Sequence, residues 1–297
     1  MTHIPVLKDE SIDGLNIHNG DVIVDGTLGG GGHTFEIIKR YGKGIKIIGL
    51  DLDLDAVTRA KKLIGTTPCD VKFFTIGFQA VDEVLDELGI QEINGMLLDL
   101  GISSFQLEVA GRGFSFLKDE PLLMTMKKDP NDEDLTAKEI VNTWEEETIA
   151  DIIYGFGEEK YSRKIARAII EARKEKEIET TFDLVKIIDE AVGKYYRKMK
   201  IHPATRTFQA LRIATNSELV NLEEVIKNGF KRLAKGGRMS IITFHSLEDR
   251  IVKRAFVKLK EDGEAKIITK RPMIPKEEEL KLNPRSRSAK LRLIEKL

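Results

Sequence analysis

The chain has 297 residues, of which 41% are hydrophobic and 33% are charged. This composition is ordinary for a folded domain of this size, and it excludes disordered and fibrous classes. A single cysteine excludes a disulfide framework and a cysteine-based zinc site, and no apolar run approaches the length of a membrane helix. The N-terminus shows no secretory signal pattern, so we expect a cytoplasmic protein.

The formal net charge of −1 conceals a gradient along the chain. Residues 1–110 carry −8, residues 111–205 carry −3 and residues 206–297 carry +10. A basic C-terminal third suits a polyanionic partner such as RNA, because lysine and arginine displace counterions from phosphates. The alternative is a solvated surface whose charges balance in the folded molecule.

Short apolar runs alternate with helical patterns in the first hundred residues. The expected strands are 21–25, 45–50, 71–76 and 95–100, and the expected helices are 34–41, 56–64 and 80–88. This alternation predicts a doubly wound, mostly parallel α/β sheet with helices on both faces.

From about residue 111 to residue 205 the patterns are helical only, with expected helices at 137–144, 161–175 and 181–193. The α/β pattern then resumes with a helix at 222–234 and strands at 238–244, 265–270 and 290–295. Ser246 and Asp249 fit a capping box that opens a helix, and residues 272–288 read as an exposed excursion. We therefore expect a discontinuous core, 1–110 and 206–297, interrupted by an all-helical domain at 111–205 that recognises the substrate.

The strongest local motif is DGTLGGGGH at residues 25–33, between the first expected strand and helix. Consecutive glycines allow a ligand to approach the backbone closely at a helix N-terminus. Asp51 ends the second strand 22 residues after Gly29, a spacing that suits a carboxylate on ribose hydroxyls. A tight turn that binds nothing is the structural alternative.

The motif fits neither a GxGxxG dinucleotide loop nor a P-loop, which needs a lysine for phosphates. A zwitterionic ligand without phosphate, such as S-adenosylmethionine, fits this acidic region better. His33 lies inside the loop and Asp99 ends the fourth strand at the same rim, while Phe78 follows the third strand and could pack against an adenine. The alternatives are a core role for Phe78 and helix capping for Asp99.

Several stretches, in order along almost the whole chain, resemble the bacterial small-subunit ribosomal RNA cytosine-N4 methyltransferase family. They are HIPV at 3–6, DGTLGGGGH at 25–33, LLDLGISS at 97–104, RGFSF at 112–116, YGFGEE at 154–159, RKIARAI at 163–169, HPATRTFQALRI at 202–213, GGR at 236–238, FHSLEDR at 244–250 and NPRSRS at 283–288.

This resemblance implies a class I S-adenosylmethionine-dependent methyltransferase with a Rossmann-like sheet and an inserted helical domain. It implies that a cytidine in the decoding region of small-subunit (16S) ribosomal RNA is methylated, with S-adenosylhomocysteine as product. The cofactor contacts that it implies are Gly31, Gly32, His33, Asp51, Phe78, Asp99 and Gln106. No metal is expected, because neither these residues nor the chemistry requires one.

The chain departs from the family at two positions after the RGFSF motif. Leu123 and Thr125 stand where the family usually has an aspartate and an arginine. Because this chain lacks the charged pair, a role of that pair in shaping the substrate pocket does not carry over to it.

The lone pair of the cytosine N4 amine is delocalised into the ring, which makes the amine a poor nucleophile. Methylation therefore needs oxygen atoms that accept hydrogen bonds from the two N4 hydrogens and so localise the lone pair on the nitrogen. The Asp/Asn-Pro-Pro-aromatic motif common among amino-group methyltransferases is absent, and Asp99 stands in its place. We therefore expect Asp99, or hydroxyls of Ser103 and Ser104, to hold the amine, with the target base unstacked.

Other polar residues are candidates for RNA contacts. Pro203 is placed to open a helix with Arg206, Gln209 and Arg212 on one polar face, although these three could instead form a buried network that joins the helical insertion to the sheet. The remaining candidates are His245, whose alternative role is capping or core packing, and Arg112 in the RGFSF motif.

Two other functions remain open from the sequence: a methyltransferase acting on another substrate, and a ribosome assembly factor that retains the cofactor pocket. The sequence also leaves open monomer or homodimer, the nucleotide that is modified, and whether naked RNA or the assembled subunit is the substrate.

Overall fold

The structure is a computed structural model that describes residues 4–196 and 201–297. It contains two compact units. We call Met1–Gly101 with Leu219–Leu297 the sheet unit, and Ile102–Glu218 the helical unit. The helical unit thus extends further at both ends than the 111–205 expected from the sequence. His3, in the first family motif, lies outside the described residues.

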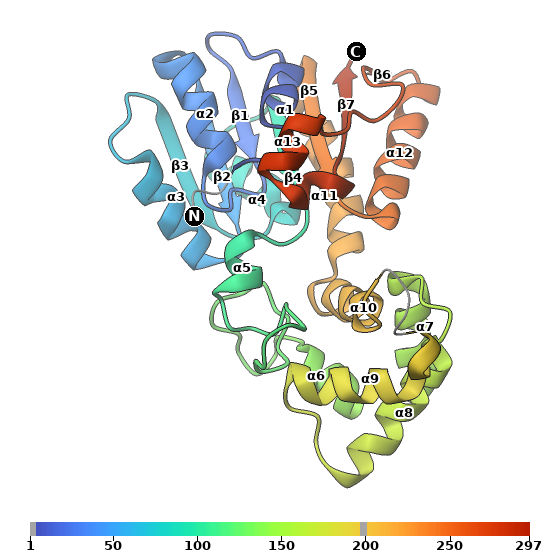
Figure 1. Ribbon diagram of the computed structural model, residues 1–297. Coiled ribbons are helices and arrows are strands. Elements are labelled where there is room, and N and C mark those ends of the chain that lie inside the picture. The colour runs from blue at the N-terminus through green and yellow to red at the C-terminus, as the bar shows by residue number, and fades with distance from the viewer. Residues whose placement is uncertain (1–3, 197–200) are drawn as a thin grey trace. The chain divides into compact units, whose positions relative to one another are not determined.

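A seven-stranded sheet forms the centre of the sheet unit (Figure 1). Its strands are β1 (Val22–Asp25), β2 (Lys46–Asp51), β3 (Asp70–Thr75), β4 (Ile93–Asp99), β5 (Leu233–Thr243), β6 (Ala265–Ile267) and β7 (Lys290–Lys296). The order is β3-β2-β1-β4-β5-β7-β6, with β7 antiparallel to both neighbours and the other pairings parallel. The expected strands are all present, although β6 is shorter than predicted.

Helices cover the two faces of this sheet. They are α1 (Lys8–Leu15), α2 (Gly32–Tyr41), α3 (Leu54–Ile64), α4 (Val81–Glu87), α11 (Glu218–Arg232), α12 (Ser246–Glu261) and α13 (Glu277–Leu282), with 3-10 turns η1 (Gly42–Gly44), η2 (Phe78–Ala80) and η3 (Pro284–Ser288). Asp53 caps α3 by accepting a hydrogen bond from the amide of Asp55.

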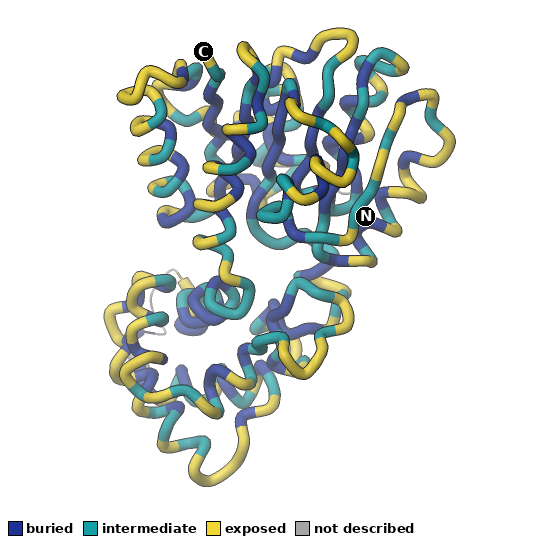
Figure 2. Tube along the Cα trace, turned by 180° about the vertical axis from the view of Figure 1, so that it is seen from behind, coloured by how far each residue is buried: buried dark blue, intermediate teal, exposed yellow. Residues whose placement is uncertain are grey.

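Alternate residues of the strands point to different cores, as the period of two requires. Ile23 and Ile47 pack with α1 and α2, whereas the next residues, Val24 and Ile48, pack in the core that contains α4, α11 and α12. Figure 2 shows the resulting run of buried residues along the central strands. Because β1, β2 and β4 are covered on both sides, they are almost continuously apolar until each ends in an aspartate.

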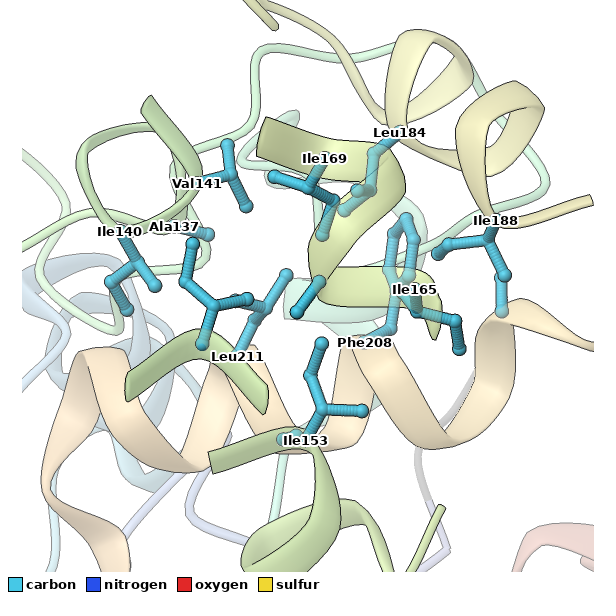
Figure 3. Close-up of a cluster of buried hydrophobic side chains, with 14 of the residues drawn as sticks. Ala137, Ile140, Val141, Ile153, Ile165, Ile169, Leu184, Ile188, Phe208 and Leu211 are labelled. Atoms are coloured by element: carbon cyan, nitrogen blue, oxygen red, sulfur yellow. The ribbon is translucent and has the colours of Figure 1, made fainter. Parts of the chain in front are cut away.

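The helical unit consists of helices joined by irregular segments. They are α5 (Ser104–Glu108), α6 (Ala137–Thr143), α7 (Glu146–Gly157), α8 (Ser162–Glu175), α9 (Thr181–Tyr196) and α10 (Ala204–Asn216). Its core joins Ile153, Ile165, Ile169, Phe208 and Leu211, which come from α7, α8 and α10 (Figure 3).

The sequence patterns do not predict α7, because its two glycines lower its helix propensity. Packing explains one of them: a β-carbon on Gly157 would lie 2.5 Å from the carbonyl oxygen of Arg206 in α10. The close approach of α7 and α10 therefore requires a residue without a side chain here. In the part of the chain that the structure describes, no helix combines the length and apolarity needed to cross a bilayer.

Candidate functional site

Three carboxylates end three adjacent strands of the sheet unit. Asp25, Asp51 and Asp99 are the last residues of β1, β2 and β4, and the strand order places β1 between the other two. Because these strands are parallel, their carboxyl ends lie at one edge of the sheet, which is where open α/β sheets bind ligands. We call this edge the carboxylate rim.

The glycine-rich loop crosses this rim between β1 and α2. The amide of Gly29 donates a hydrogen bond to Oδ2 of Asp51 at 2.7 Å. Gly31 caps α2 with φ of +82°, and a β-carbon there would lie 2.9 Å from Cβ of Ala60. In contrast, β-carbons on Gly29 and Gly30 would meet no side chain within 4 Å. The loop therefore packs on α3 through Gly31 and leaves the backbone of Gly29 and Gly30 open to a ligand.

Burial raises the pKa of Asp51 to about 6, although the amides of Asp53 and Gly29 donate to its carboxylate and oppose the shift. Burial also raises the pKa of Asp25 to about 6, against hydrogen bonds from Thr34 and Thr27. Asp25 is not among the site residues expected from the sequence. Its signal was available, because an aspartate ends a buried strand directly before the glycine loop.

Asp99 is the carboxyl group of the rim with the fewest internal contacts. Its Oδ1 is buried and has no hydrogen-bond partner among the described residues. Its Oδ2 lies 3.8 Å from Nδ1 of His33, and its amide donates to Oγ1 of Thr27 at 2.6 Å. Burial, and then the nearby charge of Asp25, raise the pKa of Asp99 well above its ordinary value.

His33 is buried at the start of α2, and its two ring nitrogens face different groups. Nε2 lies 3.1 Å from the carbonyl oxygen of Val6. Because a carbonyl only accepts, Nε2 carries a proton, and Nδ1 is the nitrogen turned toward Asp99. The N-terminal segment thus orients the histidine at the rim.

Phe78 begins η2 directly after β3 and is half-buried against the core beneath α4. A β-carbon on Gly26 would lie 3.2 Å from Cβ of Phe78, so Phe78 lies next to the start of the loop. Its packing on the core agrees with the core role, and the contact with an adenine stays a prediction.

The expected contacts after β4 belong to the helical unit. Ser103 and Gln106 form a reciprocal capping box at α5, in which each side chain accepts a hydrogen bond from the other residue's amide. Ser104 is the first residue of that helix. Arg112 is buried and donates to the carbonyl oxygen of Met126 at 2.8 Å.

Arg206, Gln209 and Arg212 on α10 are held by contacts within the helical unit. Arg206 donates to the carbonyl oxygen of Glu158 at 3.0 Å, and Gln209 donates to that of Phe156 at 2.9 Å. Arg212 forms two hydrogen bonds with the carboxylate of Glu218. These bonds make the three residues part of a structural network, but the network lies inside the helical unit and does not join it to the sheet as the alternative expected.

His245 lies beyond the carboxyl end of β5 and caps α12. The amide of Glu248 lies 3.4 Å from Nδ1 of His245, and the carboxylate of Glu248 accepts from the amide of His245. The expected capping box between Ser246 and Asp249 is therefore wrong by one position. Asp249 instead pairs with Lys290 and Arg292 of β7, which holds its pKa below the ordinary value against the effect of burial.

The rim suits a ligand with a positive charge and hydroxyl groups. A buried carboxylate oxygen without a partner favours a cation, and paired carboxylates disfavour phosphate groups. S-adenosylmethionine fits both requirements, because it carries a sulfonium, an ammonium and a ribose diol. Together with the sheet order, this rim defines a class I S-adenosylmethionine-dependent methyltransferase.

The chain belongs to the MraW methylase family, which it matches over residues 1–297. It is 46% identical to a ribosomal RNA small subunit methyltransferase H of Clostridium botulinum and 44% identical to one of Clostridioides difficile, each alignment covering 99% of both chains. Among solved structures, a putative rRNA methylase from Clostridium thermocellum aligns with 100% of this chain and 98% of its own, at 11% identity and a TM-score of 0.49.

Proposed function

We propose that this protein transfers a methyl group from S-adenosylmethionine to N4 of a cytidine in the decoding region of small-subunit (16S) ribosomal RNA. The observation that carries the proposal is the buried, unpartnered Oδ1 of Asp99 at the carboxylate rim, in a chain whose whole length matches a methylase family. The names of the curated relatives support ribosomal RNA of the small subunit as the substrate.

The cofactor contacts follow from the rim and from the family resemblance. Asp51 would hold the ribose hydroxyls, Phe78 the adenine, and Gly31, Gly32 and His33 the methionine portion. In the helical unit the resemblance adds Gln106. When bound, S-adenosylmethionine supplies an electrophilic methyl group on its sulfonium sulfur.

The amine of the target cytosine needs an acceptor for the hydrogen that it loses. Oδ1 of Asp99 is free to accept that proton, and its raised pKa makes the carboxylate a stronger base than an exposed aspartate. His33, with Nδ1 facing Oδ2 of Asp99, would keep the carboxylate oriented. Hydroxyls of Ser103 or Ser104 are the alternative acceptors.

The helical unit would recognise the substrate. Arg206 keeps about a third of its side chain exposed, although its guanidinium also contacts the α7 end, so it is the strongest of the α10 candidates for an RNA contact. We place the reaction in the cytoplasm with the assembling small subunit as partner.

Radiolabelled methyl transfer tests this function directly. The purified chain, given labelled S-adenosylmethionine, should label small subunits from cells that lack the corresponding methylation, and the label should map to an N4-methylcytidine. Subunits from methylation-competent cells are the control. The proposal is wrong if the deficient subunits take up no more label than this control, and label in protein or in free cytidine would point to another substrate.

A further inference from the structure

A cavity lies in the sheet unit at the carboxyl end of β5, with a volume of about 330 Å³. Its apolar lining includes Phe244, Ile274 and Leu280. Its polar lining includes Arg287, Ser288 and Lys290, and no acidic residue lines the cavity. This volume, at the lower end of the range for ligand pockets, suits a single nucleotide.

The cavity adjoins the carboxylate rim through neighbouring strands. Asp99 pairs in register with Ile242, and the amide of Leu100 donates to the carbonyl oxygen of Ile242 at 3.0 Å. A β-carbon on Gly101 would lie 3.5 Å from the ring of Phe244. A polymer bound at the rim therefore reaches this cavity by extending from the carboxyl end of β4 to the carboxyl end of the neighbouring strand β5.

Arg287 is the cation best placed to bind an anion here. It is exposed and forms no ion pair with any other described residue. Lys290, in contrast, lies 3.1 Å from the carboxylate of Asp249, which also pairs with Arg292. The charge of Lys290 is thus partly neutralised, whereas that of Arg287 remains available.

Residues 272–288 are mostly exposed, as expected from the sequence, but the segment that carries Arg287 is anchored. Met273 exchanges two backbone hydrogen bonds with Leu291 of β7. Asn283 donates to the carbonyl oxygen of Ile4, and the hydroxyl of the buried Ser286 donates to the carbonyl oxygen of Asn283. These bonds hold the polar wall in place, so binding would cost little ordering entropy.

We propose that this cavity binds one nucleotide of the substrate RNA, a neighbour of the methylated cytidine in the same strand. The base packs against Phe244, Ile274 and Leu280, and Arg287 binds the phosphate. The basic C-terminal third of the chain supplies the matching charge. This inference rests on the proposed function. It adds a binding position on the enzyme for the RNA nucleotide next to the target cytidine.

Two substitutions separate the phosphate contact from the base contact. Arg287→Ala should raise KM for methylation-deficient small subunits about tenfold and lower the salt dependence of binding by about one counterion. Ile274→Ala should raise KM about fivefold with an unchanged salt dependence, because base packing involves no charge. Arg285→Ala is the matched control, since Arg285 is exposed in the same 3-10 turn but does not line the cavity.

Binding of S-adenosylhomocysteine and the melting temperature should be the same in all three variants and the wild type. If Arg287→Ala and Ile274→Ala methylate subunits with wild-type KM, the cavity assignment is wrong while the proposed function stands. Equal weakening by Arg287→Ala and Arg285→Ala would also overturn it, because that result describes a diffuse basic surface. Failure of the wild type to label subunits would instead refute the proposed function.

Discussion

At the scale of single residues, burial changes the acid–base properties of Asp99, which lies beside His33. The pKa of Asp99 is raised, and Nδ1 of His33 faces its Oδ2 at 3.8 Å while Nε2 faces the carbonyl oxygen of Val6. A bound cation at the rim would favour the ionised form of the Asp99 carboxyl group.

Asp99→Asn should separate stability from function. The asparagine has the shape of the protonated acid but cannot ionise, so we expect methyl transfer to fall by at least about a hundredfold at saturating cofactor. Because ionisation of the buried acid opposes folding, the free energy of unfolding at pH 8 should equal or exceed that of the wild type. Methyl-transfer kinetics and urea unfolding measure the two effects. Full turnover in this variant would exclude a role of Asp99 in catalysis.

Asp25 predicts a pH dependence of stability. Its pKa is raised from 3.8 to about 6, so the folded protein holds this proton more tightly than the unfolded chain. The stabilisation is fully present below about pH 4 and is lost as the pH rises through about 6. Relative to Asp25→Asn, the wild type should therefore lose up to about 3 kcal/mol of unfolding free energy between pH 4 and pH 7.

Urea unfolding at several pH values measures this difference. Asp129→Asn, a change at an exposed aspartate, is the control and should follow the wild type at every pH. A constant difference between the wild type and Asp25→Asn across this range would show that Asp25 titrates normally.

At the scale of elements, the glycine loop combines two different requirements. Gly31 needs both its positive φ and the space against Ala60, whereas Gly30 has no positive φ and open space around its β-carbon position. Of these two glycines, only Gly31 is required by the fold, and the open side of the loop at Gly30 leaves space for a ligand.

Gly31→Ala and Gly30→Ala test this division. Gly31→Ala should lower the free energy of unfolding by about 2–3 kcal/mol, through left-handed backbone strain and the contact with Ala60. Gly30→Ala should leave stability within about 0.5 kcal/mol, yet weaken S-adenosylhomocysteine in calorimetry. Wild-type affinity in Gly30→Ala would show that the ligand does not approach this side of the loop.

The elements also show where local patterns suffice. The seven strands follow from apolar runs, and the rim carboxylates Asp51 and Asp99 follow from the ends of those runs. The helix α7 does not, because it contains two glycines, of which Gly157 is required by the close contact with α10. The capping box of α12 begins at His245, for which capping was the alternative role, and not at Ser246 as expected. Histidine is an uncommon N-cap, and Ser246 has the more usual side chain.

At the scale of the whole molecule, the two compact units have separate buried cores. The core of the helical unit contains Leu211 and Phe208, and neither belongs to the cores around the sheet. Damage to this core should therefore affect the proposed substrate recognition before it affects the carboxylate rim.

Leu211→Ala tests this separation in the full chain. Removal of the fully buried side chain should lower the stability of the helical unit by about 2–5 kcal/mol. We expect methyl transfer to small subunits to fail at a lower temperature than in the wild type, while affinity for S-adenosylhomocysteine at 25 °C stays within about threefold. Leu117→Ala, at an exposed leucine of the same unit, should change neither property. Loss of cofactor affinity in Leu211→Ala would show that the units depend on each other for the rim.

The sequence by itself determined the seven strands, the glycine loop and the family, because each of these follows from local spacing and residue type. Only the tertiary structure decided which polar groups are satisfied. Arg206, Gln209 and Arg212 look like an RNA-binding face in sequence, but they bond to carbonyls and a carboxylate supplied by distant or neighbouring segments. By contrast, Oδ1 of Asp99 has no hydrogen-bond partner and Arg287 has no ion pair among the described residues. Whether a polar group lacks such a partner depends on the whole surrounding fold.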